Sequence, residues 1–406
     1  MLDLSPASLA ERQLAGDRQR TKRFDGIFER KVERMRVSPL AFLRGSAPLF
    51  YEILAARPDL ARGPAGVGWI AGDLHLENFG AYRADEHSFE KGHKSGDRVV
   101  FDLNDFDEGI VAPWRYDVLR LVTSVILGGR AAGEDGVGAI ALATALLDAY
   151  VATACEAARP ATAPRAVLAL IEQVRSRTRL QLLDARTVAV HGRRVFRRGP
   201  RYRDLAPAIV KGATKAFADY IEALPEDARP TPQQAEITDL ALRIAGTGSL
   251  GCLRVAVLVT GKGGVDGGWI FDMKEEDAPA LGDLAHAPKS LAPAERVIAG
   301  MSACLEHPPQ MAAATRLRTT SMLVRRLAPQ EDKLAFQRLP PSDLPAIAAY
   351  LGSCAGAAHR RGATRPTKKP WTQDERAHLI ENAIELAGLH EATYLAFCRR
   401  IGAARA

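Results

Sequence analysis

The stretch that most constrains the fold of this 406-residue chain lies at residues 69–108 and contains two short boxes. The first, Gly-Asp-Leu-His-Leu-Glu-Asn-Phe-Gly at 72–80, reads as a loop with the carboxylate of Asp73 five positions before the carboxamide of Asn78. The second, Val-Val-Phe-Asp-Leu-Asn-Asp-Phe-Asp-Glu at 99–108, reads as an apolar strand that ends in carboxylates. Mg²⁺ prefers oxygen ligands and takes only one or two carboxylates, leaving its other positions to water and phosphate. These boxes therefore predict a site for a divalent metal and a phosphate.

Ordinary structural roles are the alternative for both boxes. Asp73 could cap a turn, and the carboxylates of the second box could be a solvated strand end. A hairpin signal at Gly92, Gly96 and Asp97 separates the boxes, and this order favours a functional site. The sequence has no 12-residue loop with the ligand spacing of a calcium site, so magnesium is the predicted metal.

A glycine-rich region follows at residues 246–274. Gly246, Gly248 and Gly251 form the pattern G-x-G-x-x-G, and predicted strands follow at 253–259 and 269–274. In a dinucleotide-binding fingerprint the third glycine opens a helix, but here the glycines join strand to strand. A plain hairpin is the alternative to a phosphate-binding loop.

The two regions together resemble the protein-kinase-like phosphotransferases. In that superfamily an Asp-x-x-x-x-Asn loop supplies the catalytic base and one metal ligand, and a strand-end Asp holds the metal against the phosphates. The motif Gly-Asp-Leu-His-x-x-Asn most resembles that of the aminoglycoside phosphotransferases and choline kinases, although this chain has Ala71 where those relatives carry His. Their metal Asp is followed twelve positions later by another Asp, as Asp105 is by Asp117. The resemblance thus favours Asp105 over Asp102 and Asp107.

The resemblance also implies a role for each matching residue. Lys274 ends the strand that carries the phosphate-pairing lysine of kinases, and Glu295 in the next predicted helix would orient it by an ion pair, with Glu306 as the other candidate. Glu275 and Glu276 are expected to point elsewhere. The implied set is Asp73 as base, Asn78, Asp105 and Asp107 for Mg²⁺, and Gly246, Gly248, Ser249, Gly251 and Lys274 for the phosphates of ATP.

The order of these parts is unusual, because the glycine-rich loop of a kinase precedes its catalytic loop. The sequence therefore predicts an α+β, two-lobed, kinase-like fold that is circularly permuted, with a small antiparallel-sheet nucleotide lobe. Residues 1–240 would form the mainly helical catalytic lobe, 241–335 the nucleotide lobe, and 336–406 helices that pack on the catalytic lobe. The alternative is an unpermuted fold with an unrecognised N-terminal lobe.

The same motifs identify a second, wider resemblance. The two boxes, Ser38-Pro39, Gly248-Ser249-Leu250-Gly251, Lys274-Glu275 and Val324-Arg325-Arg326-Leu327 occur in this order in a large bacterial family known only as a domain of unknown function. This resemblance spans almost the whole chain but implies no substrate.

Charge and composition limit the kinds of binding partner and the cellular location that the sequence predicts. The net charge of +7 predicts an anionic partner, and the most basic segment, residues 175–203, has only Phe196 and Tyr202 interleaved, which argues against single-stranded nucleic acid. Arg44, among apolar residues, is a further candidate for anion binding. The five scattered cysteines predict neither zinc nor disulfides. Without a signal peptide or an apolar run near 18 residues, a cytoplasmic protein that does not span a membrane is expected.

These observations predict an ATP- and Mg²⁺-dependent phosphotransferase with a small-molecule acceptor. Transfer of AMP by the same residues, and nucleotide binding without turnover, are the two alternatives. The product formed from ATP would discriminate them.

Overall fold

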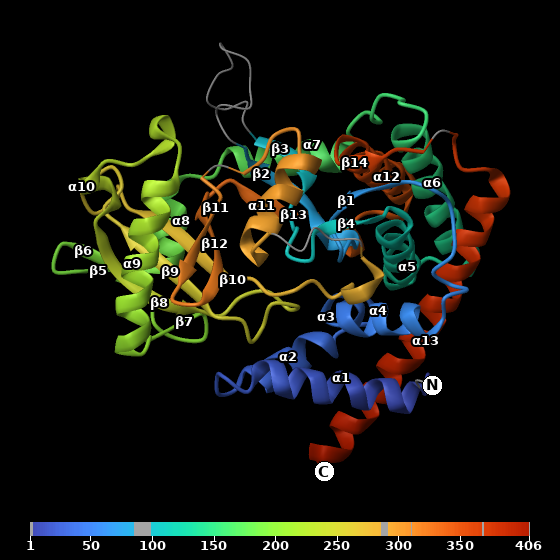
Figure 1. The fold of residues 1–406 in the computed structure, drawn as a ribbon, viewed down its shortest axis with the longest axis horizontal. Coiled ribbons are helices and arrows are strands. Elements are labelled where there is room, and N and C mark those ends of the chain that lie inside the picture. The colour runs from blue at the N-terminus through green and yellow to red at the C-terminus, as the bar shows by residue number, and fades with distance from the viewer. Residues whose placement is uncertain (1–2, 85–98, 286–290, 310, 368, 406) are drawn as a thin grey trace.

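The computed structural model describes residues 3–84, 99–285, 291–309, 311–367 and 369–405. Helices gather on one side of the molecule and the largest sheet on the other, with smaller sheets between them (Figure 1). The expected α+β class is confirmed.

The largest sheet has six antiparallel strands. In spatial order they are β11 (Ala313–Leu317), β12 (Thr320–Leu327), β10 (Trp269–Glu275), β9 (Arg254–Val259), β8 (Ile237–Arg243) and β7 (Tyr202–Arg203). The predicted strands at 253–259 and 269–274 are therefore confirmed, and residues 244–253 join β8 to β9. Helix α9 (Pro207–Ala223) packs on this sheet, where Phe217 meets Phe271 with ring centroids 5.1 Å apart. Helix α11 (Pro293–Cys304) connects β10 to β11.

The helical side is built from both ends of the chain. Its helices are α1 (Pro6–Thr21), α2 (Ile27–Met35), α3 (Pro39–Gly45), α4 (Ala47–Ala56), α5 (Arg115–Ala131), α6 (Gly136–Ala154), α12 (Leu344–Arg361) and α13 (Gln373–Arg405). Helix α13 packs against α1, α3 and α5 (Figure 1).

The two boxes lie in and between the strands of two three-stranded sheets. One has the order β14 (Ala363–Arg365), β1 (Val67–Ile70), β4 (Ile110–Pro113), and the other β13 (Glu331–Lys333), β2 (Phe79–Arg83), β3 (Val99–Leu103). Strands β2 and β3 pair antiparallel, as a hairpin requires, while Gly92, Gly96 and Asp97 lie outside the described residues. Because β13 directly follows β12, the chain passes from the six-stranded sheet to the sheet of the first box within residues 328–330.

The arginine-rich segment lies between α6 and the six-stranded sheet. It runs from the end of α7 (Arg165–Arg175) through α8 (Arg179–Arg186), β5 (Thr187–Val190) and β6 (Arg193–Phe196) to β7. Strands β5 and β6 form a separate two-stranded sheet.

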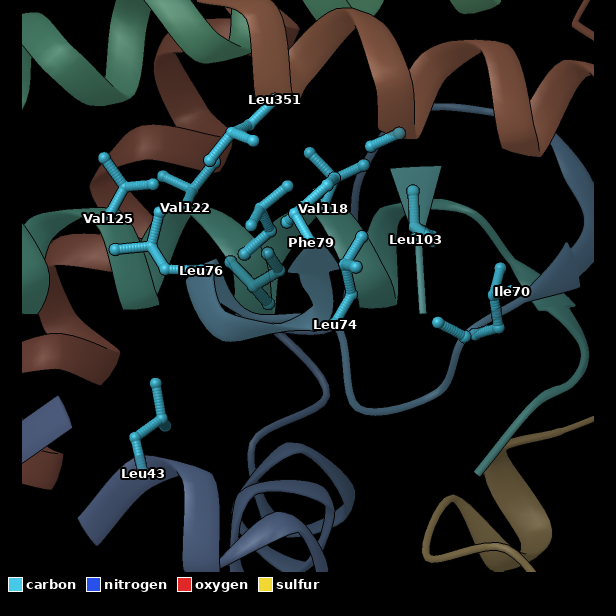
Figure 2. Close-up of a cluster of buried hydrophobic side chains, with 14 of the residues drawn as sticks. Leu43, Ile70, Leu74, Leu76, Phe79, Leu103, Val118, Val122, Val125 and Leu351 are labelled. Carbon is cyan, nitrogen blue, oxygen red and sulfur yellow. The ribbon is translucent and has the colours of Figure 1, made fainter. Parts of the chain in front are cut away.

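Alternation of apolar and polar residues fixes the first box to the core. Leu74, Leu76 and Phe79 are fully buried and lie among side chains of α5 and β3 (Figure 2). Burying each such side chain stabilises the fold by about 1.5–3 kcal/mol. The side chains of Asp73 and His75, which flank Leu74, are turned to the other side of the loop, where they line a cavity.

Helix α6 corrects one expectation from the sequence. It is the one helix, within the described part of the chain, that is long and apolar enough to cross a membrane. It packs instead against α5 and α12, and half of its apolar window is buried inside the fold. The apolar stretch is explained by this core position.

Candidate functional site

The predicted site residues converge on one cavity of about 250 Å³, here called the central pocket. It lies where the loop of the first box meets the six-stranded sheet. The predicted residues that line it are Asp73, Asn78, Asp105, Asp107, Gly246, Gly248, Ser249 and Lys274. Asp105 and Lys274, far apart in sequence, thus face the same cavity.

Helix α5 holds the backbone of the first box through Asp117. Its fully buried carboxylate accepts hydrogen bonds from the backbone N–H groups of Ala71 (2.7 Å) and Gly72 (2.9 Å). His359 of α12 approaches the same carboxylate with Nε2 at 3.2 Å. Tyr51 donates its hydroxyl to the carbonyl of Gly72 at 2.5 Å. The loop is therefore fixed before Asp73 by groups from three helices.

Asp73 is held by a buried arginine. The Nε atom of Arg120 donates to Oδ1 of Asp73 at 2.5 Å, and its Nη2 donates to the carbonyl of Leu43 at 2.8 Å. The Arg120 side chain is 0% exposed and its guanidinium stacks over the ring of Phe50. Burial raises the pKa of Asp73 to about 7, although Arg120 opposes the rise. Asp73 therefore changes protonation near neutral pH.

His75 and Asn78 close the loop on each other. The backbone N–H of His75 donates to Oδ1 of Asn78 at 3.0 Å, and the backbone N–H of Glu77 donates to Nδ1 of His75 at 3.2 Å. Burial, with Arg44 next in importance, keeps the pKa of His75 well below its usual range. His75 is therefore neutral with its proton on Nε2, 3.9 Å from Oδ2 of Asp73. Oδ1 of Asn78 keeps a second lone pair for a metal.

Lys274 is paired within the pocket, but with different partners from the predicted one. Its ammonium forms ion pairs with Asp107 and with Glu276, the latter at 3.0 Å. Alternate residues of a strand share a face, so Glu276 lies beside Lys274, and the expectation that it points elsewhere is wrong.

The expected ion pair between Glu295 and Lys274 is not formed. The Glu295 carboxylate instead accepts a hydrogen bond from the backbone N–H of Ala292 at 2.9 Å. This is a capping interaction in the first turn of α11, which satisfies a free N–H group at the helix start. Glu306, the other candidate, lies 3.9 Å from Arg361.

The carboxylates beside Lys274 differ in their proton affinity. Burial, reinforced by the neighbouring Asp107, raises the pKa of Asp105. Burial also acts to raise the pKa of Asp107, but Lys274 outweighs it and the pKa is lowered. Burial and Asp107 raise the pKa of Glu276 to about 8. Asp102 lies apart from the central pocket and pairs with Arg361 at 3.1 Å.

The pocket as a whole suits a cation. Seven carboxylates and four cationic side chains line it, and the excess negative charge would be offset by a divalent metal. No group of three or more His, Cys, Asp or Glu side chains has metal-binding spacing in the described residues. Asn78, Asp105 and Asp107 offer oxygen donors in the lining, and Mg²⁺ needs only one or two carboxylates because water and phosphate complete its shell.

The glycines of the G-x-G-x-x-G loop have different surroundings. Gly246 has φ +77° and lines the pocket, and a Cβ at Gly248 would meet only the carbonyl of Arg44, at 3.6 Å. Gly251, with φ +106°, faces away from the central pocket: a Cβ there would lie 2.5 Å from the carbonyl oxygen of Arg20. Close packing against the end of α1, rather than ligand approach, requires this third glycine.

Several pocket residues were not found from the sequence. Arg20 and Lys333 are such residues, whereas Arg44, the expected candidate for anion binding, lines the pocket while paired with Glu77 at 2.7 Å. Arg120 could have been predicted from the sequence, because it follows Asp117 by three positions and so lies on the same face of the helix. Arg20, Lys333 and His359 had none, since only the fold brings them near the boxes.

No curated protein and no solved structure matches the chain. A match to a protein family covers residues 23–400, and that family is described as "Uncharacterized protein conserved in bacteria (DUF2252)". Both boxes, the glycine-rich loop and Lys274 lie within the matched residues. The chain therefore belongs to the DUF2252 family.

Proposed function

We propose that the protein is an ATP- and Mg²⁺-dependent phosphotransferase with a kinase-like, circularly permuted fold and a small-molecule acceptor. The observation that carries the proposal is the convergence of Asp73, Asp105 and Lys274 on one cavity beneath a glycine-rich loop. Phosphoryl transfer needs a base, a metal-holding carboxylate and cationic contacts to the phosphates, arranged around one reacting group. The central pocket offers all three.

Asp105 and Asn78 would hold the metal, and Asp107 is a further candidate. When bound, Mg²⁺ neutralises charge on the phosphates of ATP. Asp107 is engaged by Lys274 in the structure, which favours Asp105 as the first ligand. The raised pKa of Asp105 fits this role, because a metal would relieve the repulsion from Asp107 that contributes to the rise.

Lys274 can bind phosphate without leaving its carboxylates. An ammonium group has three donors, and Asp107 and Glu276 occupy two of them. These two carboxylates outweigh the effect of burial and keep the pKa of Lys274 above its usual value. The lysine therefore stays charged and holds its third donor in a fixed direction.

Asp73 would accept the proton of the acceptor hydroxyl. A general base works best when its pKa lies near the operating pH, and the pKa of Asp73 is about 7. Arg120 fixes the carboxylate through Oδ1 and leaves Oδ2 toward the neutral His75. The side chain keeps 22% exposure, so an acceptor can reach it.

AMP transfer by the same residues is the second candidate, because a second cavity of about 210 Å³ adjoins the central pocket and shares Asp105, Gly246 and Lys274 with it. Apolar side chains of Phe106, Val297 and Met301 form part of its wall, which gives a nucleotide room for a second orientation. A nucleotide bound in the opposite orientation would present its α-phosphate to the acceptor.

The deciding experiment is to incubate the protein with ATP, Mg²⁺ and a panel of hydroxyl acceptors and to separate ADP from AMP. ADP supports phosphoryl transfer, and AMP supports the second candidate. Asp105→Asn should abolish either product, whereas Asp374→Asn, an exposed carboxylate in the first turn of α13, should change neither.

A binding measurement covers the case in which the acceptor is missing from the panel. A ligand that binds only the native state raises its stability, by about 2.7 kcal/mol at a hundredfold excess over Kd. We expect thermal stabilisation by ATP with Mg²⁺ and not by ATP with a chelator. No stabilisation at millimolar ATP would contradict both enzymatic functions and nucleotide binding without turnover.

A further inference from the structure

The cationic side chains that line the central pocket fall into two groups. Lys274 and Arg44 are each held by carboxylates of neighbouring elements or of their own strand. Lys333 and Arg20 line the same pocket, but the side chain of neither forms a hydrogen bond or an ion pair with another residue of the described chain. The charge of these two residues is therefore available to a bound anion.

Strand β13 directs Lys333 toward the site. The two residues before it hold the strand in place, because Glu331 pairs with Arg325 at 2.9 Å and Asp332 pairs with Arg177. Alternate residues of a strand share a face, so Lys333 lies on the same face as Glu331. Both residues line the cavity of about 210 Å³ that adjoins the central pocket, and Lys333 lines the central pocket as well.

The register of β13 fixes the backbone of Lys333 beside the first box. Lys333 is the cross-strand neighbour of Gly80, and the N–H of Leu334 donates to the carbonyl of Phe79 at 3.4 Å. Gly80 ends the first box, two positions after the predicted metal ligand Asn78. The side chain of Lys333 is exposed, and its four-carbon stem is flexible. The backbone is thus anchored while the ammonium group can move.

The charge of Lys333 acts on two groups of the predicted reaction centre. Burial, the largest influence, raises the pKa of Asp105 and lowers the pKa of His75, and the charge of Lys333 acts to lower both. Asp105 is the favoured metal ligand, and Nε2 of His75 lies 3.9 Å from the carboxylate of Asp73. Lys333 therefore lies near both the metal-binding end of the site and its base. A phosphoryl group that passes from ATP to an acceptor at Asp73 would lie between them.

We propose that Lys333 is a further catalytic residue, which binds the γ-phosphoryl group of ATP during its transfer. This inference rests on the proposed phosphotransferase activity. In the transfer, the acceptor oxygen forms a bond to the γ-phosphorus and gives its proton to Asp73. The bond from that phosphorus to the β–γ bridging oxygen breaks, and its electron pair leaves with ADP. Lys333 stays protonated throughout and offsets the negative charge on the oxygens of the transferred group.

Lys274 is less suited to this role. Its two carboxylate partners, Asp107 and Glu276, hold its ammonium group in one place. That arrangement suits the phosphates that remain on ADP and do not move during the reaction. Lys333 has no such restraint among the described residues, so its ammonium can follow the group that moves.

The test compares the dissociation constants of ADP and of the non-hydrolysable β,γ-imido analogue of ATP, both with Mg²⁺, by titration calorimetry. We expect Lys333→Met to weaken binding of the ATP analogue by about tenfold or more and binding of ADP by less than about twofold, because ADP lacks the γ-phosphoryl group. Lys333→Arg keeps the charge and should recover most of the affinity. Lys274→Met should weaken binding of both nucleotides.

The matched control is Lys262→Met, which removes an exposed lysine outside the central pocket and should change neither dissociation constant. Because Lys333 is exposed, Lys333→Met should unfold at the same urea concentration as the wild-type protein. Equal losses for ADP and the ATP analogue in Lys333→Met would place the lysine on a phosphate that both nucleotides share and would overturn the proposal. Unchanged binding of both would overturn it as well. Absence of binding of either nucleotide to the wild-type protein would instead contradict the proposed function itself, and this inference with it.

Discussion

The ammonium group of Lys274 lies 3.0 Å from Oε1 of Glu276, two residues further along the same strand. Glu276 thus fills the position that an acidic residue of the following helix was expected to fill. The other partner of Lys274, Asp107, comes from the second box, so one lysine joins the six-stranded sheet to that box. The lysine is held by residues on both sides of the pocket.

The raised pKa of Glu276 predicts a pH-dependent stability. Its pKa moves from 4.5 to about 8 on folding, so the folded state favours the protonated form. The resulting stabilisation is complete below the unfolded pKa and is lost as the pH rises through about 8. Glu276→Gln cannot titrate, and its free energy of unfolding should therefore fall less than that of the wild type between about pH 5 and pH 9.

Urea unfolding at a series of pH values measures this difference. Glu156→Gln, which removes an exposed carboxylate, should keep the wild-type pH dependence. An unchanged slope in Glu276→Gln would show that Glu276 is ionised in the folded protein throughout this range.

Asp73 and Arg120 should be strongly coupled in stability. Removing one partner of a buried ion pair leaves an uncompensated charge and costs about 3–5 kcal/mol. Arg120 is fully buried, so Asp73→Asn should destabilise the protein by about this amount. Adding Arg120→Met should restore part of the loss, because the buried cation is then gone. A double-mutant cycle by chemical denaturation measures the coupling, and additive single effects would contradict it.

His359 should control the rigidity of the loop before Asp73. It contacts the Asp117 carboxylate at 3.2 Å and the Tyr150 hydroxyl at 2.8 Å. His359→Ala should cost about 1–3 kcal/mol because these buried groups lose a partner. Amide hydrogen exchange should rise at Ala71 and Gly72, whose N–H groups bind Asp117, while Val257 in β9 serves as the unaffected reference. Equal changes at all three amides would indicate general destabilisation only.

The second and third glycines of the G-x-G-x-x-G pattern, Gly248 and Gly251, should respond differently to alanine. Gly251→Ala places a methyl group 2.5 Å from the Arg20 carbonyl at a positive φ and should destabilise the protein by more than about 1 kcal/mol. Gly248→Ala has space for its methyl group and should leave stability within about 0.5 kcal/mol. If the loop covers phosphates, Gly248→Ala should still weaken stabilisation by ATP with Mg²⁺. Thermal unfolding with and without nucleotide measures both effects.

Local patterns predicted the strands and the glycine loop well. Alternation located β9 and β10, and the residues of both boxes reached one cavity because each box is rigidly tied to a buried strand or loop. The same local logic should have placed Glu276 with Lys274, since residues two apart on a strand share a face. The kinase resemblance predicts Glu295 as the partner instead, but its carboxylate binds the backbone N–H of Ala292.

Contacts between distant segments could not be read from the sequence. Arg20 of α1, Lys333 of β13 and His359 of α12 reach the site only through tertiary packing. Charge composition was also a poor guide, because Arg177, Arg194 and Arg198 of the arginine-rich segment pair with carboxylates from other elements. A linear run of arginines does not reveal which of them find partners.

The packing of α13 on α1 has a consequence for how the protein is made. Five buried side chains of α13 belong to the main core: Leu379, Ala383, Leu386, Ala387 and Phe397. Helices α1, α3 and α5 precede α13 in the chain and are translated before it, although α13 is their partner in the core (Figure 1). The faces of α1, α3 and α5 that α13 covers therefore lack this partner until α13 has been translated. During that interval the apolar faces of the early helices are exposed, which makes the nascent chain a client for chaperones.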